Sequence, residues 1–253
     1  MTVNAKQPQI VAHRGASQDA PENTLPAFRL AWEQGADAIE GDFHLSKDGT
    51  IVCIHDAKTK KLADKNLVVS ESTLDELKGL DVGTHFGASF KGTTIPTIAE
   101  VFATVPTDKQ VYVEIKCGPE IIPALLDEIG KSGLSSRQVV VISFEQAVIQ
   151  ALKAEAPQFT AFWLCSFKKN YSGRVSPGLE SVLATLAEIN ADGLSSNVKI
   201  PKAFVAELKE QGFDWKVWTV NDSRTAKRMQ AWGAKSITTD VPGRMRSFLL
   251  GFK

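Results

Sequence analysis

The stretch of the chain that decides the fold is IVAHRGASQDAPENTLPAFRLAWEQGADAIEGDFHL, residues 10–45. Its first residues, 10–15, have the apolar character of a short buried strand, and residues 38–45 have it again. Between them, apolar residues recur at helical spacing over 21–35, and Gly35 is typical of a helix end. A strand, a helix and a second strand in this order predict two parallel strands joined by a right-handed crossover.

The same alternation of strands and helices continues to the end of the chain. An Asp-Gly pair at 48–49 predicts a tight bend, so we count strand 51–56 as an extension of the second unit. The remaining expected strands are 110–117, 139–144, 160–165, 192–196, 215–220 and 236–240, and the remaining expected helices are 97–105, 120–133, 145–156, 180–190, 201–212, 222–233 and 243–252. Eight strand–helix pairs predict an α/β fold that closes as a (β/α)₈ TIM barrel. The rival, an open doubly wound sheet, usually has a Gly-rich loop after its first strand, and residues 13–17 lack that glycine spacing.

The alternation breaks down over residues 57–94, a polar stretch that contains Lys, Gly and Thr. A structureless connection of this length is uncommon inside a compact barrel. We therefore expect a single barrel domain over residues 1–253, in which 57–94 form a small inserted subdomain after the second strand region.

The bulk composition excludes several classes of protein. Twenty-nine basic and 29 acidic residues give a formal net charge of zero, which argues against nucleic-acid binding through a general basic field. Cys53, Cys117 and Cys165 are far apart and form no paired metal-ligand motif, which favours reduced thiols and a reducing compartment. No apolar run reaches the roughly 18 residues of a membrane span, and the N-terminus lacks the apolar run of a signal peptide. We therefore expect a cytoplasmic protein with no integral membrane segment.

Polar side chains gather where the expected strands end, which is where the active sites of such barrels lie. Residues two apart on a strand share a face, so Glu40 points with Asp42, and Glu114 points with Lys116. If these faces are inward, three carboxylates meet, and their mutual repulsion calls for a cation. Oxygen-only ligands suit Mg²⁺ or Ca²⁺ better than Zn²⁺. A solvated strand end is the plainer explanation of one Glu-x-Asp, but two such pairs on adjacent strands favour a metal site at Glu40, Asp42 and Glu114.

Two of the four histidines, His13 and His55, end neighbouring strands beside these carboxylates. A lone histidine at a strand end is usually structural, but two beside a carboxylate cluster favour proton transfer near neutral pH. His44 lies at odd spacing from Asp42 and is expected to be structural, whereas His85, in the insertion, is open to either reading.

Four further side chains are candidates for substrate contact. The Arg14 guanidinium matches two phosphate oxygens at once, although an arginine that joins two loops is nearly as good an explanation. Lys116 is a counter-charge either for a phosphate or for the carboxylates. Phe144 and Trp218 are candidates for a wall around the non-phosphate part of the substrate, with packing in the upper barrel as the equal alternative.

Several short motifs occur in a fixed order along the chain: His-Arg-Gly (13–15), Pro-Glu-Asn-Thr (21–24), Glu-x-Asp (40–42), Lys-Asp-Gly (47–49), His-Asp (55–56), Ile-Pro-Thr (95–97), Glu-x-Lys (114–116), Trp-Thr-Val-Asn (218–221) and Thr-Asp-x-Pro (239–242). Their ordered combination closely resembles the glycerophosphodiester phosphodiesterase family over almost the whole chain. The resemblance implies a TIM barrel with a small insertion after the second strand region and a divalent cation as cofactor. It places the metal ligands at Glu40, Asp42 and Glu114, the catalytic histidines at His13 and His55, and phosphate contacts at Arg14 and Lys116.

The resemblance also implies an enzyme that hydrolyses glycerophosphodiesters to glycerol 3-phosphate and an alcohol. One histidine would take a proton from the nucleophile while the other protonates the departing alcohol oxygen. The nucleophile is either water or the glycerol 2-hydroxyl of the substrate itself. Which histidine acts first as the acid, the head group and the oligomeric state stay open.

Alternative functions make different demands on the sequence. A lysophospholipase D acting on lipid-like diesters needs an apolar strip for an acyl chain, and residues 57–94 contain Phe86 and Phe90 but are otherwise polar. Relatives that cleave sphingomyelin and resemble spider toxins usually carry disulfides and a distinct C-terminal tail, and neither is evident. A non-catalytic barrel that binds phosphorylated ligands does not need both histidines and all three carboxylates. Metal sites of the amidohydrolase type need a His-x-His pair on the first strand, and the expected first strand of this sequence has none.

Overall fold

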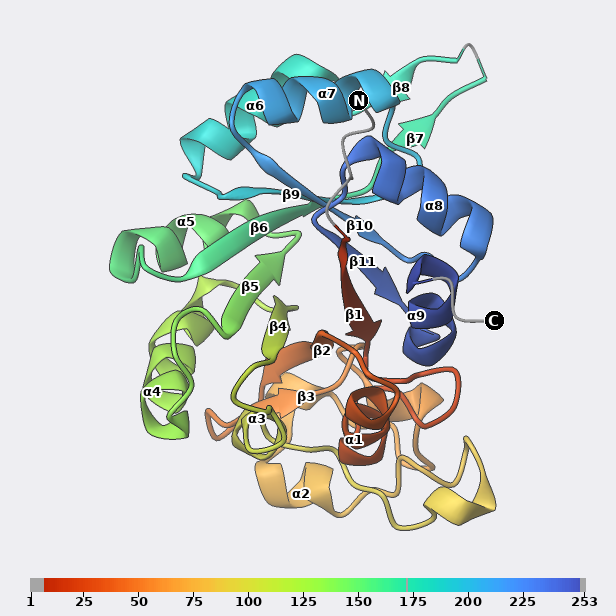
Figure 1. Ribbon diagram of the computed structural model, residues 1–253. Helices are drawn as coiled ribbons and strands as arrows, with labels where there is room; N and C mark the ends of the chain where they lie inside the picture. Colours follow the sequence, from red (N-terminus) through yellow and green to blue (C-terminus); the bar gives the residue numbers. More distant parts are fainter. Residues whose placement is uncertain (1–6, 172, 251–253) are drawn as a thin grey trace.

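Within residues 7–171 and 173–250, which the computed structural model describes, eight parallel strands form a closed barrel (Figure 1). The strands follow one another around the barrel in chain order, and the last pairs in parallel with the first. They are β1 (Gln9–His13), β2 (Ala38–Leu45), β4 (Gln110–Ile115), β5 (Val139–Ser143), β6 (Thr160–Cys165), β9 (Gly193–Asn197), β10 (Asp214–Trp218) and β11 (Ser236–Thr239). The predicted TIM barrel is therefore confirmed.

The helices lie around the outside of the barrel (Figure 1). They are α1 (Leu25–Glu33), α3 (Ile98–Phe102), α4 (Ile122–Ser132), α5 (Gln146–Glu155), α6 (Leu179–Glu188), α7 (Lys202–Glu210), α8 (Ser223–Trp232) and α9 (Pro242–Leu250). The predicted helices match these except at their ends. Helix α1 begins four residues later than predicted, because Thr24 is its N-cap and accepts a hydrogen bond from the Ala27 amide. The last two residues of the predicted helix 243–252 lie outside the described residues.

Side chains on the barrel strands alternate between two apolar cores. One core packs the strands against the helices and contains Ile10, Phe28 and Ile39 among many others. The other fills the barrel interior with Val11, Ala38, Tyr112, Val140, Ile142, Phe162 and Leu164. Glu40 and Asp42 continue the face that begins at Ala38, and Glu114 continues the face of Tyr112. These three carboxylates therefore point into the barrel.

The second barrel strand is extended by a hairpin. Strand β3 (Ile51–Cys53) pairs antiparallel with β2, with Phe43 opposite Cys53, after a turn in which Gly49 has a φ of +80°. This confirms the predicted bend at 48–49. β3 ends at Cys53, three residues before the predicted end of the strand, so His55 and Asp56 lie on the irregular segment that follows it.

Residues 57–94 lie outside the strand order of the barrel. They contain the 3₁₀ turns η1 (Thr59–Lys61), η2 (Val69–Glu71) and η3 (Ala88–Phe90) and the short helix α2 (Leu74–Lys78). Their apolar residues join the hairpin side chains in a cluster apart from the two barrel cores: Val52, Ile54, Val69, Leu77, Leu80, Val82 and Ile95. That this segment is a separate subdomain stays a prediction.

One element between β6 and α6 was not predicted. A two-stranded hairpin of β7 (Lys168–Lys169) and β8 (Val175–Ser176) projects there. Its four strand residues are two exposed lysines, the partly buried Val175 and an exposed serine, so they lack the apolar alternation from which strands are predicted. Among the helices that the structure describes, none has the length and apolar character needed to cross a membrane.

Candidate metal and catalytic centre

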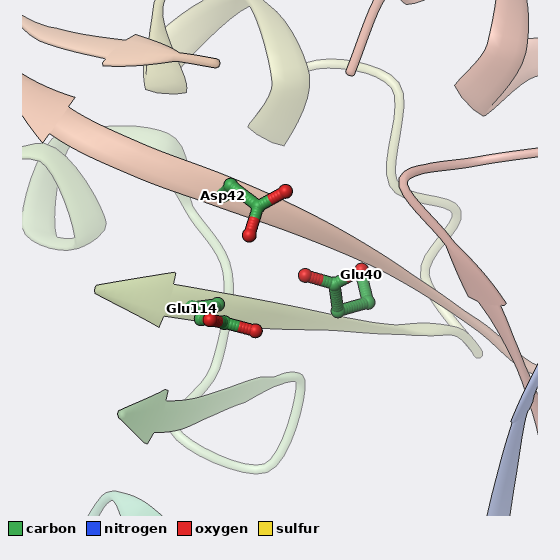
Figure 2. A group of neighbouring side chains, drawn as sticks. All are labelled: Glu40, Asp42 and Glu114. Atoms are coloured by element: carbon green, nitrogen blue, oxygen red, sulfur yellow. The ribbon is translucent and has the colours of Figure 1, made fainter. Parts of the chain in front are cut away.

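Three carboxylates meet at the carboxyl ends of β2 and β4. Strand register places Asp42 beside Glu114, and Glu40 lies two residues earlier on the same face of β2. One ligand oxygen from each residue lies within 4.8 Å of the other two. All three residues are buried, with 1%, 1% and 8% exposure for Glu40, Asp42 and Glu114. Figure 2 shows the three carboxyl groups directed into one common space.

The protonation of this cluster reflects its burial. Burial and the nearby Asp42 raise the pKa of Glu40 to about 8, although the positive charges of His13 and Arg14 oppose the shift. Burial and Asp42 also raise the pKa of Glu114. The Glu40 Oε1 atom finds no hydrogen-bond partner within the described part of the chain. A divalent cation would fit here, since it would satisfy that oxygen and offset the crowded charge.

Asp42 is the carboxylate that the surrounding side chains hold in the ionised form. Its burial works to raise its pKa, but the positive charges of Arg14 and Lys116 outweigh burial and lower the pKa. Asn23 binds it twice, since the Asn23 amide donates to Oδ2 at 2.8 Å and its Oδ1 accepts from the Asp42 backbone amide at 3.1 Å. Lys116 Nζ lies 3.4 Å from Asp42 Oδ1 and donates to Glu114 Oε1 at 2.7 Å. Lys116 therefore contacts two of the three carboxylates.

His13 ends β1 directly beside the cluster, in register with Glu40. Its Nδ1 lies 2.7 Å from Asp240 Oδ1, and Asn221 donates to the other oxygen of Asp240 at 2.6 Å. Burial works to lower the pKa of His13, but the hydrogen bond to Asp240 and the charge of Glu40 outweigh it and raise the pKa. Because a carboxylate only accepts, Nδ1 carries a proton, which leaves Nε2 as the other ring nitrogen for a further contact.

His55, on the segment after β3, is also held by an aspartate. Its Nδ1 lies 2.6 Å from Asp56 Oδ1, and Lys61 Nζ contacts Asp56 Oδ2 at 2.5 Å. The hydrogen bonds from Lys61 and His55 lower the pKa of Asp56, so this carboxylate stays ionised. The neighbouring His44 lies 3.1 Å through Nε2 from the His55 carbonyl, which supports the structural role expected for His44.

The loop after β1 is shaped to place Arg14. This residue adopts a left-handed backbone with φ of 55°, which is uncommon for a residue other than glycine. Its backbone amide donates to Glu40 Oε2 at 2.9 Å, and Nη1 donates to Glu22 Oε1 at 2.9 Å. Its Nε lies 3.1 Å from Asp42 Oδ2 as an ion pair that is not aligned for a hydrogen bond. Gly15 follows because a Cβ there would lie 2.6 Å from the Ala27 backbone of α1.

Phe144 and Trp218 contact each other across the mouth of the barrel. Their rings lie 5.7 Å apart, edge to face, and Phe144 is 45% exposed. Trp218 also packs against the apolar cluster inside the barrel. Its buried indole N–H makes no hydrogen bond to any part of the chain that the structure describes. Trp218 therefore packs in the upper barrel, and Phe144 lies exposed against it.

A cavity of about 340 Å³ opens between the barrel and residues 57–94. Its barrel side is lined by Arg14, Ser17, Glu22, His55 and Asp56, and its other side by Lys58, Lys61, Leu62, His85 and Phe86. His55 and Arg14 line it, whereas His13 and the three carboxylates do not, and Arg14 connects the cavity to the cluster through its ion pair with Asp42. His85, left open by the sequence, lies on the wall of this cavity.

Four polar residues with a clear place in the site were not assigned roles from the sequence: Asn23, Asp56, Asn221 and Asp240. All four belong to the ordered motifs, so their position near the site was signalled. Their partners were not, because His13 and Asp240 are 227 residues apart and meet only when β11 pairs with β1.

The chain matches the model of the glycerophosphoryl diester phosphodiesterase family over residues 13–244. A glycerophosphodiester phosphodiesterase of Caldanaerobacter subterraneus subsp. tengcongensis is 33% identical over 237 residues, which cover 92% of this chain and 94% of the relative. A putative glycerophosphodiester phosphodiesterase of Bacillus subtilis is 32% identical with the same coverage. Among solved structures, an Oleispira antarctica phosphodiesterase in complex with its product sn-glycerol 3-phosphate has a TM-score of 0.85, 27% identity and 96% coverage of both chains. This chain therefore belongs to the glycerophosphoryl diester phosphodiesterase family of enzymes.

Proposed function

We propose that the protein hydrolyses glycerophosphodiesters to sn-glycerol 3-phosphate and an alcohol, with a divalent cation and two histidines as proton-transfer groups. The observation that carries the proposal is the juxtaposition of three buried carboxylates with two imidazoles that are each anchored through Nδ1. The relatives named for this activity support it. The solved relative with bound sn-glycerol 3-phosphate supports a small-molecule substrate.

Glu40, Asp42 and Glu114 would hold the cation. Their oxygen-only donor set suits Mg²⁺ or Ca²⁺, and the unpartnered Oε1 of Glu40 is a free donor atom for either ion. A bound cation would supply positive charge that offsets the negative charge growing on the phosphate in the transition state.

His13 and His55 would move the protons. Each imidazole has its Nδ1 tied to an aspartate, so each would use Nε2 towards the substrate. One Nε2 would accept the proton of the attacking hydroxyl, and the other would donate a proton to the departing alcohol oxygen. The attacking hydroxyl is that of water or the glycerol 2-hydroxyl of the substrate.

The remaining candidates would bind and orient the substrate. Arg14 and Lys116 both form ion pairs with Asp42, and Arg14 also lines the cavity, so their positive charges would attract a phosphate bound beside the carboxylates. The unpartnered indole N–H of Trp218 would donate to a substrate oxygen, while the Trp218 and Phe144 rings would contact the glycerol carbons.

Substitution of the histidines tests this proposal. His13→Ala and His55→Ala should each lower kcat on a glycerophosphodiester by about 10²–10⁴-fold, the usual contribution of a general acid or base. Coupled detection of glycerol 3-phosphate measures the rate. Near-full activity in either variant would remove that histidine from the mechanism.

Removal of the cation tests the metal site separately. EDTA should abolish turnover, and addition of Mg²⁺ or Ca²⁺ should restore it, because uncompensated carboxylates repel the phosphate. A metal-free preparation that keeps its activity in chelator would contradict the metal assignment.

Lysophospholipase D activity is the second candidate, and a rat lysophospholipase D is 26% identical to the chain. The cavity favours small polar substrates instead, because its outer wall has two lysines and a histidine against the apolar Leu62 and Phe86. Comparison of glycerophosphocholine with lysophosphatidylcholine as substrates separates the two. A cytoplasmic location remains part of the proposal, supported by free thiols at Cys53, Cys117 and Cys165.

A further inference from the structure

The cavity beside His55 is larger than a phosphate group needs. Its volume of about 340 Å³ falls within the range of small-molecule sites, roughly 300–1,000 Å³. Arg14 and His55 line its inner end, next to the carboxylates, and residues 57–94 line its outer end. Phe144 and Trp218 do not line it. A substrate held by its phosphate at Arg14 would therefore extend one of its two alcohol groups into this space.

The first part of the outer wall, which carries Lys58, is held in place by local backbone bonds. Lys58 forms an isolated antiparallel bridge with Val68. Thr59, next to it, is fully buried, and its hydroxyl accepts from the Leu67 amide at 2.9 Å. The lysine therefore extends from a fixed backbone position beside His55, rather than from a free loop.

The second part of the outer wall, which carries His85 and Phe86, is held by the carboxylate of Asp81. That carboxylate accepts hydrogen bonds from the backbone amides of Gly83, Thr84 and Gly92. Gly83 is required there, since a Cβ would lie 2.0 Å from the Phe90 carbonyl oxygen. The Phe86 and Phe90 rings also pack edge to face at 5.4 Å.

Positive charge predominates on the cavity lining. The two carboxylates that line it are already paired, Glu22 with Arg14 at 2.9 Å and Asp56 with Lys61 at 2.5 Å. The Lys58 ammonium forms no ion pair within residues 7–171 and 173–250 and is the excess charge on the wall. A cationic head group would meet no unpaired carboxylate, and Phe86 alone does not make the aromatic cage that binds quaternary ammonium groups.

We propose that the cavity between His55 and residues 57–94 binds the departing alcohol of the substrate and that Lys58 selects for alcohols with negative charge. The inference rests on the proposed function and names the substrate class for it: glycerophosphodiesters whose alcohol carries an anionic group, such as a phosphate on a polyol. The glycerol group would then lie on the side of Trp218 and Phe144.

A charge series of substrates tests this selection. Glycerophosphocholine, glycerophosphoglycerol and glycerophosphoinositol 4-phosphate share the glycerophosphoryl group and differ in the charge of the alcohol, which is positive, neutral and negative. In the wild-type enzyme, kcat/KM should rise along this series. Lys58→Glu should lower kcat/KM for the anionic diester roughly three- to ten-fold, because the attraction between the exposed lysine and the anionic alcohol is replaced by a repulsion. The value of kcat/KM for the neutral diester should stay within about two-fold of wild type.

Lys60→Glu is the matched control. It makes the same charge change two residues away, at an exposed side chain that does not line the cavity, and should keep the wild-type order of substrates. Circular dichroism checks that both variants are folded.

Three results would overturn the inference. The first is a higher kcat/KM of the wild-type enzyme for the cationic diester than for the anionic one. The second is an equal loss of kcat/KM on all three diesters in Lys58→Glu, and the third is an unchanged kcat/KM on all three in that variant. An equal loss would place the common glycerol group in the cavity. Absence of turnover of all three diesters by the wild-type enzyme with added Mg²⁺ or Ca²⁺ would instead overturn the proposed function, and this inference with it.

Discussion

At the scale of single residues, the site depends on side chains that hold other side chains. Asp240 fixes the proton of His13 on Nδ1. Asn221 in turn holds Asp240 through two hydrogen bonds. The Asn221 side-chain amide donates to Asp240 Oδ2, and the Asp240 backbone amide donates to Asn221 Oδ1 at 2.9 Å. Partners of this kind set the tautomer and the pKa of an imidazole without touching the substrate. Asp240 is therefore a positioning residue.

Asp240→Asn should lower the pKa of His13. The hydrogen bond to Asp240 is the main influence that opposes the burial of His13, so a neutral partner leaves burial to favour the uncharged imidazole. An NMR titration of His13 in metal-free protein should show the shift, and the corresponding limb of the pH–rate profile should move to lower pH. Ser17→Ala is the control, because Ser17 donates to the same oxygen only at 3.3 Å and its loss leaves the carboxylate in place. An unchanged titration of His13 in Asp240→Asn would contradict the assignment.

At the scale of elements, the barrel strands carry the chemistry and the 57–94 segment shapes access to it. The strand ends are held by the continuous ladder of the sheet, from β1 around to β11. The loop at 81–92 has no such ladder, and the Asp81 carboxylate accepts hydrogen bonds from three of its backbone amides. Hydrogen bonds from the Thr84 hydroxyl and from backbone amides keep the pKa of the Asp81 carboxyl far below its ordinary value.

Asp81→Asn should loosen this loop. The pKa of the Asp81 carboxyl is lower in the folded protein than in the unfolded chain, so its ionised form stabilises the fold. This stabilisation is fully present at a pH above the unfolded-state pKa. It is lost as the pH falls through the folded-state pKa. The neutral amide lacks the charge at every pH, so the Thr84 and Gly92 amides should exchange hydrogen faster than in wild type at neutral pH. Asp75→Asn, an exposed acid of α2 in the same segment, is the control. Equal exchange rates in wild type and Asp81→Asn would show that the loop is held by other contacts.

At the scale of the whole molecule, the ionised forms of Glu40 and Glu114 oppose folding when no cation is bound, because burial raises the pKa of both groups. Glu40 keeps its proton in the folded state up to a pKa of about 8, whereas its ordinary value is 4.5. Between these values the folded protein holds a proton that the unfolded chain releases. The free energy of unfolding therefore falls as the pH rises, by up to about 1.4 kcal/mol per pH unit from this group.

Glu40→Gln should flatten this dependence. The thermal midpoint of metal-free wild-type protein should fall, relative to Glu40→Gln, as the pH is raised from about 5 to about 8. Added Mg²⁺ or Ca²⁺ should raise the thermal midpoint of the wild-type protein, and the increase should be larger at higher pH, because the ion competes with the proton for Glu40. Glu155→Gln, at an exposed site on α5, should behave as wild type. Parallel curves for wild type and Glu40→Gln would mean that Glu40 is ionised without a metal.

Much of the fold follows from local pattern. The βα repeat predicts the number and order of the barrel strands, and the spacing of Glu40 and Asp42 predicts that they share a face. Boundaries are less accurate, as at α1 and β3, because caps and turn bonds decide them. The β7–β8 hairpin escaped prediction because each strand is only two residues long, and of the four strand residues only Val175 packs against the core.

The sequence by itself determined the family, the (β/α)₈ architecture and the set of acidic and imidazole side chains at the strand ends. Only the tertiary structure decided which of these side chains are partners, as for His13 with Asp240 and Asn23 with Asp42. It also decided that Lys58 and His85 line a cavity with His55. The physical reason is that periodicity records which face of a strand or helix is buried, whereas contacts between distant residues arise only when the barrel closes and the insertion packs against it.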